Sequence, residues 1–106
     1  MRVAFKQFAA YATATIVASG LVLAEGDQDL AACKGESEPY RQIAGCTAVI
    51  QSGFYHGQDL ASAYFGRAIA YARTKNIDHA IEDFDAGLAV DPTNAAALYN
   101  RALAYE

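Results

Sequence analysis

Apolar residues recur every three or four positions through the second half of the chain, which is the spacing of an amphipathic helix. The polar stretch Thr74–Asn76 separates two such stripes, and Pro92 ends the second because proline cannot continue a helical hydrogen-bond ladder. Asn76 or Asp78 is expected to cap the second helix. The two stripes consist of Tyr64, Phe65, Ala68, Ile69, Tyr71 and Ala72, and of Ala80, Ile81, Phe84, Leu88 and Ala89.

A third helix is predicted from residue 95 to the end of the sequence, capped by Thr93 or Asn94. The earlier part of the chain is less regular. Pro39 suits the first turn of a helix that Gly53 ends, with apolar positions at Ile43, Cys46, Val49 and Ile50. A shorter helix over roughly residues 26–34 would come before it, with Leu30 and Cys33 facing inward, and Asp59 would cap the helix that follows residues 54–60.

The chain also repeats itself. The segment FGRAIAYA, residues 65–72, returns as YNRALAYE, residues 99–106, with Arg, Ala, Ala and Tyr at the same offsets and Ile69 replaced by Leu103. The period is 34 residues, and a fixed period in this range is typical of proteins built from stacked helical repeats. One helical hairpin cannot bury its own apolar face, so neighbouring hairpins are expected to stack on it.

Residues 61–94 resemble the tetratricopeptide repeat (TPR), a family of helical hairpins. The turn between the helices departs from the family pattern, because Lys75–Asn76 stands where a glycine usually precedes an acidic residue; asparagine tolerates the left-handed conformation. The resemblance implies an all-α, short solenoid of about five helices. The packing positions of the family's signature are filled by Tyr64, Ala68, Tyr71, Ala80, Phe84, Gly87 and Pro92.

When the chain is aligned in steps of the 34-residue repeat, residues 61–94 are a complete repeat. Residues 25–56 are then expected to form a degenerate first hairpin, and residues 95–106 the first helix of a further, truncated repeat. Cys33 and Cys46 then take the places of Tyr71 and Phe84, which face each other across a hairpin. A disulfide between them is expected if the protein is exported to an oxidising compartment. Two buried free thiols are the alternative.

The N-terminal residues 1–24 have the features of a signal peptide. Arg2 and Lys6 precede an apolar run that ends in small residues, and no acidic residue occurs before Glu25. We expect an exported protein, periplasmic or secreted. The alternative is an uncleaved anchor in the inner membrane, since the run is close to the shortest that spans a bilayer. Residues 30–33 spell a lipobox, but the carboxylates before it argue against its use.

Charge and motif content narrow the function. The chain has 12 acidic and 8 basic residues, and removal of residues 1–24 would take away two basic residues and no acidic one. With no basic stripe, nucleic acid is not an expected partner. His56 and His79 are too far apart to indicate a metal site, and the acidic run at residues 82–85 is interpreted as a solvated helix face. No enzyme activity, cofactor or small-molecule substrate is expected.

The resemblance to TPR proteins implies a module that binds a peptide or a partner helix in a concave groove formed by the first helices of the repeats. Arg67 and Arg101 could form a basic ladder for an acidic partner, or pair with acidic residues of the adjoining helix. Alternatively, the chain is part of a longer repeat array or an envelope-tethered structural domain. A far face with Leu98, Ala102 and Tyr105 would be exposed, which predicts marginal stability or a homodimer through this end. The groove residues on this registry are Phe65, Ile69, Ala72, Tyr99 and Leu103.

Overall fold

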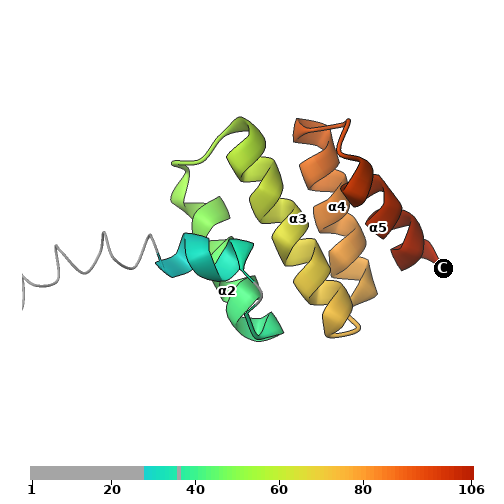
Figure 1. The fold of residues 1–106 in the computed structure, drawn as a ribbon, viewed down its shortest axis with the longest axis horizontal. Helices are drawn as coiled ribbons and strands as arrows, with labels where there is room; N and C mark the ends of the chain where they lie inside the picture. The colour runs from blue at the N-terminus through green and yellow to red at the C-terminus, as the bar shows by residue number, and fades with distance from the viewer. Residues whose placement is uncertain (1–27, 36) are drawn as a thin grey trace, which may run out of the picture.

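The computed structural model describes residues 28–35 and 37–106 of the chain. The signal segment expected at residues 1–24 lies outside the described residues. A short helix over residues 28–34 is followed by α2 (Pro39–Ser52), α3 (Gly57–Arg73), α4 (Ile77–Val90) and α5 (Ala95–Tyr105). From α2 to α5 the helices lie side by side in chain order (Figure 1). The described part thus holds five helices and no strand, and the predicted all-α fold is confirmed.

Local sequence explains where several helices begin. Pro39 is at the start of α2, where its missing N–H costs no hydrogen bond, and the Glu38 carboxylate accepts from two backbone amides of the first turn. At the start of α5, Asn94 Oδ1 accepts from the Ala97 amide at 2.9 Å, so Asn94 is the cap. Gly53 follows α2 with a positive φ of 74°, which terminates that helix in the usual way.

One of the expected helix caps was wrong, and another lacks its side-chain hydrogen bond. Helix α3 begins at Gly57, earlier than the pattern suggested, so Asp59 lies in its first turn rather than at its cap. The carboxylate still faces the positive end of the helix there. Asn76 is at the cap position of α4, but its side chain makes no capping hydrogen bond in the described structure.

The left-handed residue of the turn between α3 and α4 is Lys75, with φ 66°, and not Asn76, whose φ is −91°. The amides of Lys75 and Asn76 donate to carbonyls in the last turn of α3, which fixes the turn. A side chain with a Cβ therefore occupies the position where glycine is least strained.

The core has two clusters. The larger one joins α3, α4 and α5 and centres on Phe84, which is 1% exposed. The smaller one joins residues 28–34 to α2 and α3 around the two cysteines, Val49 and Ala63. Helix α3 takes part in both clusters, so it connects the N-terminal hairpin to the repeat that follows.

Candidate functional site

A groove runs between α3 and α5, with residues 28–34 contributing to one wall. It consists of two adjoining pockets of about 440 and 300 Å³. The pockets share three lining residues, Ile69, Phe84 and Asn100, so they form one continuous trough. Helices α3 and α5 are the two helices that the resemblance leads us to expect as first helices of repeats.

The surface of the groove is mainly apolar, with polar groups placed along it. The Asn100 side chain lies midway, where the two pockets meet, while Lys34 lines the first pocket and Arg73 the second. Lys34 is 3.9 Å from Asp59 in an exposed ion pair, which is worth little energy. Among the residues that the structure describes, no carboxylate side chain lines either pocket. The groove therefore presents cations and amides on a protein whose formal net charge is −4.

Some of the groove residues expected from the sequence line the two pockets, and others do not. Ile69, Ala72 and Leu103 line the trough, and Ile69 and Leu103 are 38% and 48% exposed. Phe65 borders the first pocket but is only 8% exposed, because its ring lies against Gly87 of α4. Tyr99, which corresponds to Phe65 one repeat later, lies outside both pockets and is 66% exposed. Tyr99 was thus wrongly placed in the groove, since the side of α3 that carries Phe65 faces α4.

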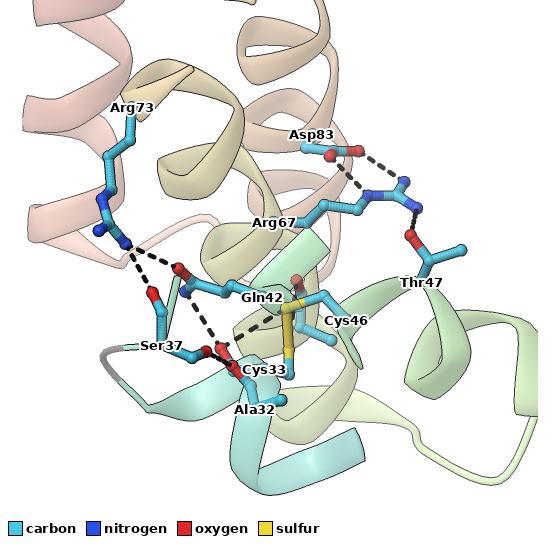
Figure 2. Close-up of a disulfide and its surroundings, with 10 residues drawn as sticks. Ala32, Cys33, Ser37, Gln42, Cys46, Thr47, Arg67, Arg73 and Asp83 are labelled. Carbon is cyan, nitrogen blue, oxygen red and sulfur yellow. Dashed lines mark hydrogen bonds and ion pairs between the residues drawn. A yellow bond between two sulfur atoms is a disulfide. The ribbon is translucent and has the colours of Figure 1, made fainter. Parts of the chain in front are cut away.

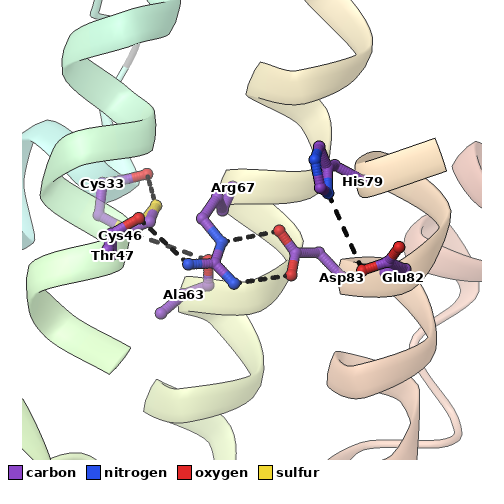
Figure 3. Close-up of polar contacts among 8 residues, drawn as sticks. All are labelled: Cys33, Cys46, Thr47, Ala63, Arg67, His79, Glu82 and Asp83. Carbon is purple, nitrogen blue, oxygen red and sulfur yellow. Dashed lines mark hydrogen bonds and ion pairs between the residues drawn. A yellow bond between two sulfur atoms is a disulfide. The ribbon is translucent and has the colours of Figure 1, made fainter. Parts of the chain in front are cut away.

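Arg67 does not point into the groove. Its Nε and Nη2 donate to the two carboxylate oxygens of Asp83 at 2.7 and 2.9 Å, and its Nη1 donates to Thr47 Oγ1 at 3.1 Å (Figure 3). The hydrogen bond with Asp83 raises the pKa of Arg67 further above its ordinary value, so the guanidinium stays charged. One side chain on α3 thereby joins α2 to α4.

Arg101 is also paired, with Asp85 Oδ1 of α4 at 2.8 Å. Between the two alternatives for the arginines, the structure therefore has ion pairs with the adjoining helix, and the basic ladder for a partner was wrong. The side chains of the Arg101 pair are 34% and 51% exposed, whereas those of the Arg67 pair are 19% and 8% exposed. Only the Arg67 pair is removed from solvent.

Asp83 was missed as a structural residue, because the acidic run at residues 82–85 was interpreted as a solvated face. Glu82 and Asp85 are exposed, but Asp83 is buried beside Phe84. The sequence feature that could have indicated its burial is its position next to Phe84, the innermost aromatic residue of α4. A carboxylate at the edge of an apolar stripe is expected to have a cationic partner.

The disulfide between Cys33 and Cys46 is present, with the two sulfur atoms 2.09 Å apart (Figure 2). It holds residues 28–34 against α2, and Cys33 and Lys34 both line the first pocket. Two glycines allow the close approach. A Cβ at Gly45 would lie 2.9 Å from Ala32 Cβ, and one at Gly66 would lie 2.8 Å from the Cys33 carbonyl oxygen.

Gln42 is a second buried polar residue that the sequence did not single out. Its Nε2 donates to the Cys33 carbonyl at 3.2 Å, and its Oε1 accepts from Arg73 Nη1 at 3.4 Å (Figure 2). Arg73 Nη1 also donates to the Ser37 carbonyl. These bonds connect the end of α3 to both sides of the disulfide loop, so the wall at residues 28–34 is attached by polar contacts as well as by the covalent link.

The residues of the repeat signature pack largely as the resemblance implied. Ala68 and Ala80 are fully buried between α3 and α4, and Pro92 is the second residue after Val90, where α4 ends. Tyr71 packs against the cluster that contains Phe84, and its ring centroid is 5.1 Å from that of His79. Tyr64 lies beside Arg67, whose guanidinium carbon is 5.9 Å from the ring centroid. Small residues at the helix contact and aromatic residues around it therefore set the hairpin geometry.

Two further observations concern other kinds of site. Within residues 28–35 and 37–106, no group of three His, Cys, Asp or Glu side chains is arranged to hold a metal ion. None of the helices in that part of the chain is both long and apolar enough to cross a membrane.

Comparison with known proteins agrees with the geometry. The family model of the tetratricopeptide repeat matches residues 61–94, which comprise most of α3, the turn at Lys75 and all of α4. Comparisons with curated proteins and with solved structures gave no significant match. Repeats of this kind are in general non-catalytic and mediate binding between proteins. The boundaries expected for the flanking segments stay predictions. Sequence and helical-hairpin geometry therefore agree that residues 61–94 form a tetratricopeptide repeat.

Proposed function

We propose that this protein binds a segment of a partner protein in the groove between α3 and α5. The observation that supports this most directly is a continuous, mainly apolar trough in a repeat whose relatives bind proteins. Apolar concave surfaces with a few placed polar groups are typical binding sites. Ile69 and Leu103 would contact an apolar side chain of the partner from the two opposite helices.

The polar groups suggest how a partner segment would be oriented. The Asn100 carboxamide both donates and accepts hydrogen bonds, so it suits the N–H and C=O of an extended peptide backbone. Lys34 and Arg73 line different pockets and would attract acidic residues flanking the apolar one. We therefore favour a peptide with an apolar centre and acidic flanks.

The experiment is selection of short random peptides displayed on phage against the full chain, followed by fluorescence polarisation with the best peptide. Ile69→Glu and Leu103→Glu are expected to weaken binding by about tenfold or more, because each places a charge in the apolar trough. Val90→Glu is the matched control, since Val90 is as exposed as Ile69, at 40% against 38%, and lies outside both pockets. Equal affinities for Ile69→Glu and Val90→Glu would exclude the groove as the site.

We also propose that the protein acts outside the cytoplasm, in the cell envelope or beyond it. The basic start and apolar run at residues 1–24 support export, and a disulfide in the fold is consistent with an oxidising compartment. N-terminal sequencing of the exported protein is expected to begin at Glu25. An N-terminus at Met1 that remains in the membrane after carbonate extraction would instead support the anchored alternative.

A further inference from the structure

Arg73, the last residue of α3, differs from the other two arginines described above in what it binds. Arg67 and Arg101 each pair with a carboxylate of α4. Arg73 lines the second pocket of the groove and forms no ion pair with any residue that the structure describes. Its two hydrogen bonds both come from Nη1 and go to neutral acceptors, the Ser37 carbonyl at 3.1 Å and Gln42 Oε1 at 3.4 Å (Figure 2). The groove thus contains a guanidinium whose charge no described carboxylate balances.

Arg67 shows how an arginine of this helix binds a carboxylate. Its Nη1 donates to Thr47 of α2, a neutral acceptor, while its Nε and Nη2 donate to the two oxygens of Asp83 (Figure 3). Arg73 also uses Nη1 for neutral acceptors on α2 and on the segment before it. Its Nε and Nη2 have no acceptor in the described part of the chain. The two donors that bind a carboxylate in Arg67 are therefore available on Arg73, and such two-point pairs are the strong ones.

The groups that hold Arg73 are themselves fixed. Ser37 and Gln42 both lie between Cys33 and Cys46, within the loop that the disulfide closes. Gln42 is only 6% exposed, and its Nε2 donates to the Cys33 carbonyl at 3.2 Å. Its Oε1 is therefore held in place for Arg73. Two fixed acceptors on one nitrogen restrict a long, exposed side chain, which lowers the conformational entropy that it loses on binding a ligand.

A simpler role for Arg73 would be to stabilise the C-terminal end of α3, where the helix dipole favours a cation. That role needs only proximity to the last carbonyls of the helix. Neither hydrogen bond of Arg73 goes to a carbonyl of α3; both go to the disulfide loop. The helix dipole therefore does not explain why a buried carboxamide on another helix holds this guanidinium beside the pocket.

Lys34 is the other cation of the groove and lines the first pocket. Its Nζ lies 3.9 Å from Asp59 Oδ1, so part of its charge is balanced within the chain. An ammonium group is also a point charge, whereas the planar guanidinium can donate to both oxygens of one carboxylate. Arg73 is therefore the better candidate for selecting an acidic side chain.

We propose that Arg73 is the specificity-determining residue of the groove, that it binds one Asp or Glu side chain of the partner segment through Nε and Nη2, and that Gln42 positions it. Because a segment must be seated in the trough, this role rests on the function proposed above. Ile69 lines both pockets and is one helical turn before Arg73, so the two side chains are neighbours on α3. The partner segment thus has an apolar side chain with an acidic neighbour at the end that lies in the second pocket.

The probes are the fluorescein-labelled groove peptide from the phage selection and the same peptide with its acidic residues changed, one at a time, to the corresponding amide. In fluorescence polarisation against the full chain, one of these changes is expected to weaken binding by about fivefold, as for a well-oriented exposed ion pair. With Arg73→Gln, that change should no longer affect the affinity. Lys34→Gln removes the other groove cation and is the matched control, in which the change should still cost about fivefold.

Gln42→Leu tests the positioning role, because it replaces the carboxamide with a side chain of similar size that has no acceptor. The acid-to-amide effect is expected to fall to about twofold, with the affinity for the amide peptide unchanged. A merely structural role would weaken both peptides alike. Circular dichroism establishes that the variant is helical. Gln42→Glu is the second variant: it keeps an acceptor for Arg73 but balances its charge, so it should also reduce the effect. An effect that stays at about fivefold in both variants would show that Gln42 does not position Arg73.

The variants distinguish this role of Arg73 from the groove itself. If Ile69→Glu weakens binding but the acid-to-amide effect survives in Arg73→Gln, the groove is correct and the role of Arg73 is wrong. Loss of the effect in Lys34→Gln instead would place the carboxylate at the first pocket and also overturn the proposal, as would selected peptides without an acidic residue. If Ile69→Glu has no effect, the proposed function fails and the role of Arg73 fails with it.

Discussion

The ring of Phe65 on α3 lies directly on the backbone of Gly87 on α4. A Cβ added at Gly87 would lie 2.6 Å from Phe65 Cδ1 and 3.0 Å from Cζ, inside normal contact distance. The two helices of the repeat approach so closely that the aromatic ring takes the space of a side chain. Gly87 is therefore required for packing, whereas its φ is that of an ordinary helix.

Gly87→Ala is expected to destabilise the protein by about 2 kcal/mol, as measured by urea denaturation. Alanine favours a helix by about 1 kcal/mol over glycine, but overpacking a core costs about 1–3 kcal/mol, and here there is no room for the methyl group. Phe65→Leu replaces the ring with a smaller side chain and should relieve the clash with the added methyl group. The double variant, Phe65→Leu with Gly87→Ala, should therefore be less destabilised than the sum of the two single changes. Additive effects would show that the contact is not the cause.

Asp83→Asn is expected to cost about 2 kcal/mol of unfolding free energy, because it leaves the Arg67 guanidinium without its carboxylate in a mostly buried site. Asp85→Asn is the matched control on the same helix. It breaks the exposed pair with Arg101 and should cost about 0.5 kcal/mol or less. Urea denaturation measures the unfolding free energy of both variants. Similar losses of unfolding free energy for the two would contradict the argument that burial strengthens the Asp83 pair.

The contrast between Asp83 and Asp85 shows where sequence pattern is a poor guide. Helical periodicity places Phe84 inward but does not say whether the residue beside it reaches solvent or a cation on another helix. That depends on Arg67, which lies on a different helix at a distance set by how closely Ala68 and Ala80 let the helices approach. Ion pairs between helices depend on how the helices pack together. A single sequence indicates them only when the repeat pattern shows which positions face each other.

The fold itself was largely predictable, since the 34-residue echo and the signature from Tyr64 to Pro92 fixed the hairpin. The registry also paired Cys33 with Cys46. The groove was predicted in position but not in all its members. Tyr99 was expected there as a residue of a first helix, but it lines neither pocket, and its counterpart Phe65 lies on the side of α3 that faces α4.

Removal of the disulfide by Cys33→Ala together with Cys46→Ala is expected to cost about 3 kcal/mol, because the link closes a short loop in the unfolded chain. Urea denaturation with and without dithiothreitol measures it. The reductant should lower the midpoint of the wild-type protein and leave that of the double variant unchanged. In hydrogen exchange, the amides of residues 28–34 should lose most protection, since the disulfide holds this segment against α2. An unchanged wild-type midpoint on complete reduction would refute this account.

Lys75→Gly is expected to stabilise the protein by about 1 kcal/mol. Lys75 has a left-handed backbone, with φ 66°, and a Cβ in that conformation costs about 1–2 kcal/mol that glycine avoids. Thr74→Gly, one residue earlier, is the matched control. Thr74 has φ −95° and its hydroxyl donates to the Tyr71 carbonyl at 2.9 Å, so glycine there should destabilise the turn. Thermal unfolding should therefore shift upward for Lys75→Gly and downward for Thr74→Gly, and a downward shift for both would mean that Lys75 stabilises the turn through its side chain.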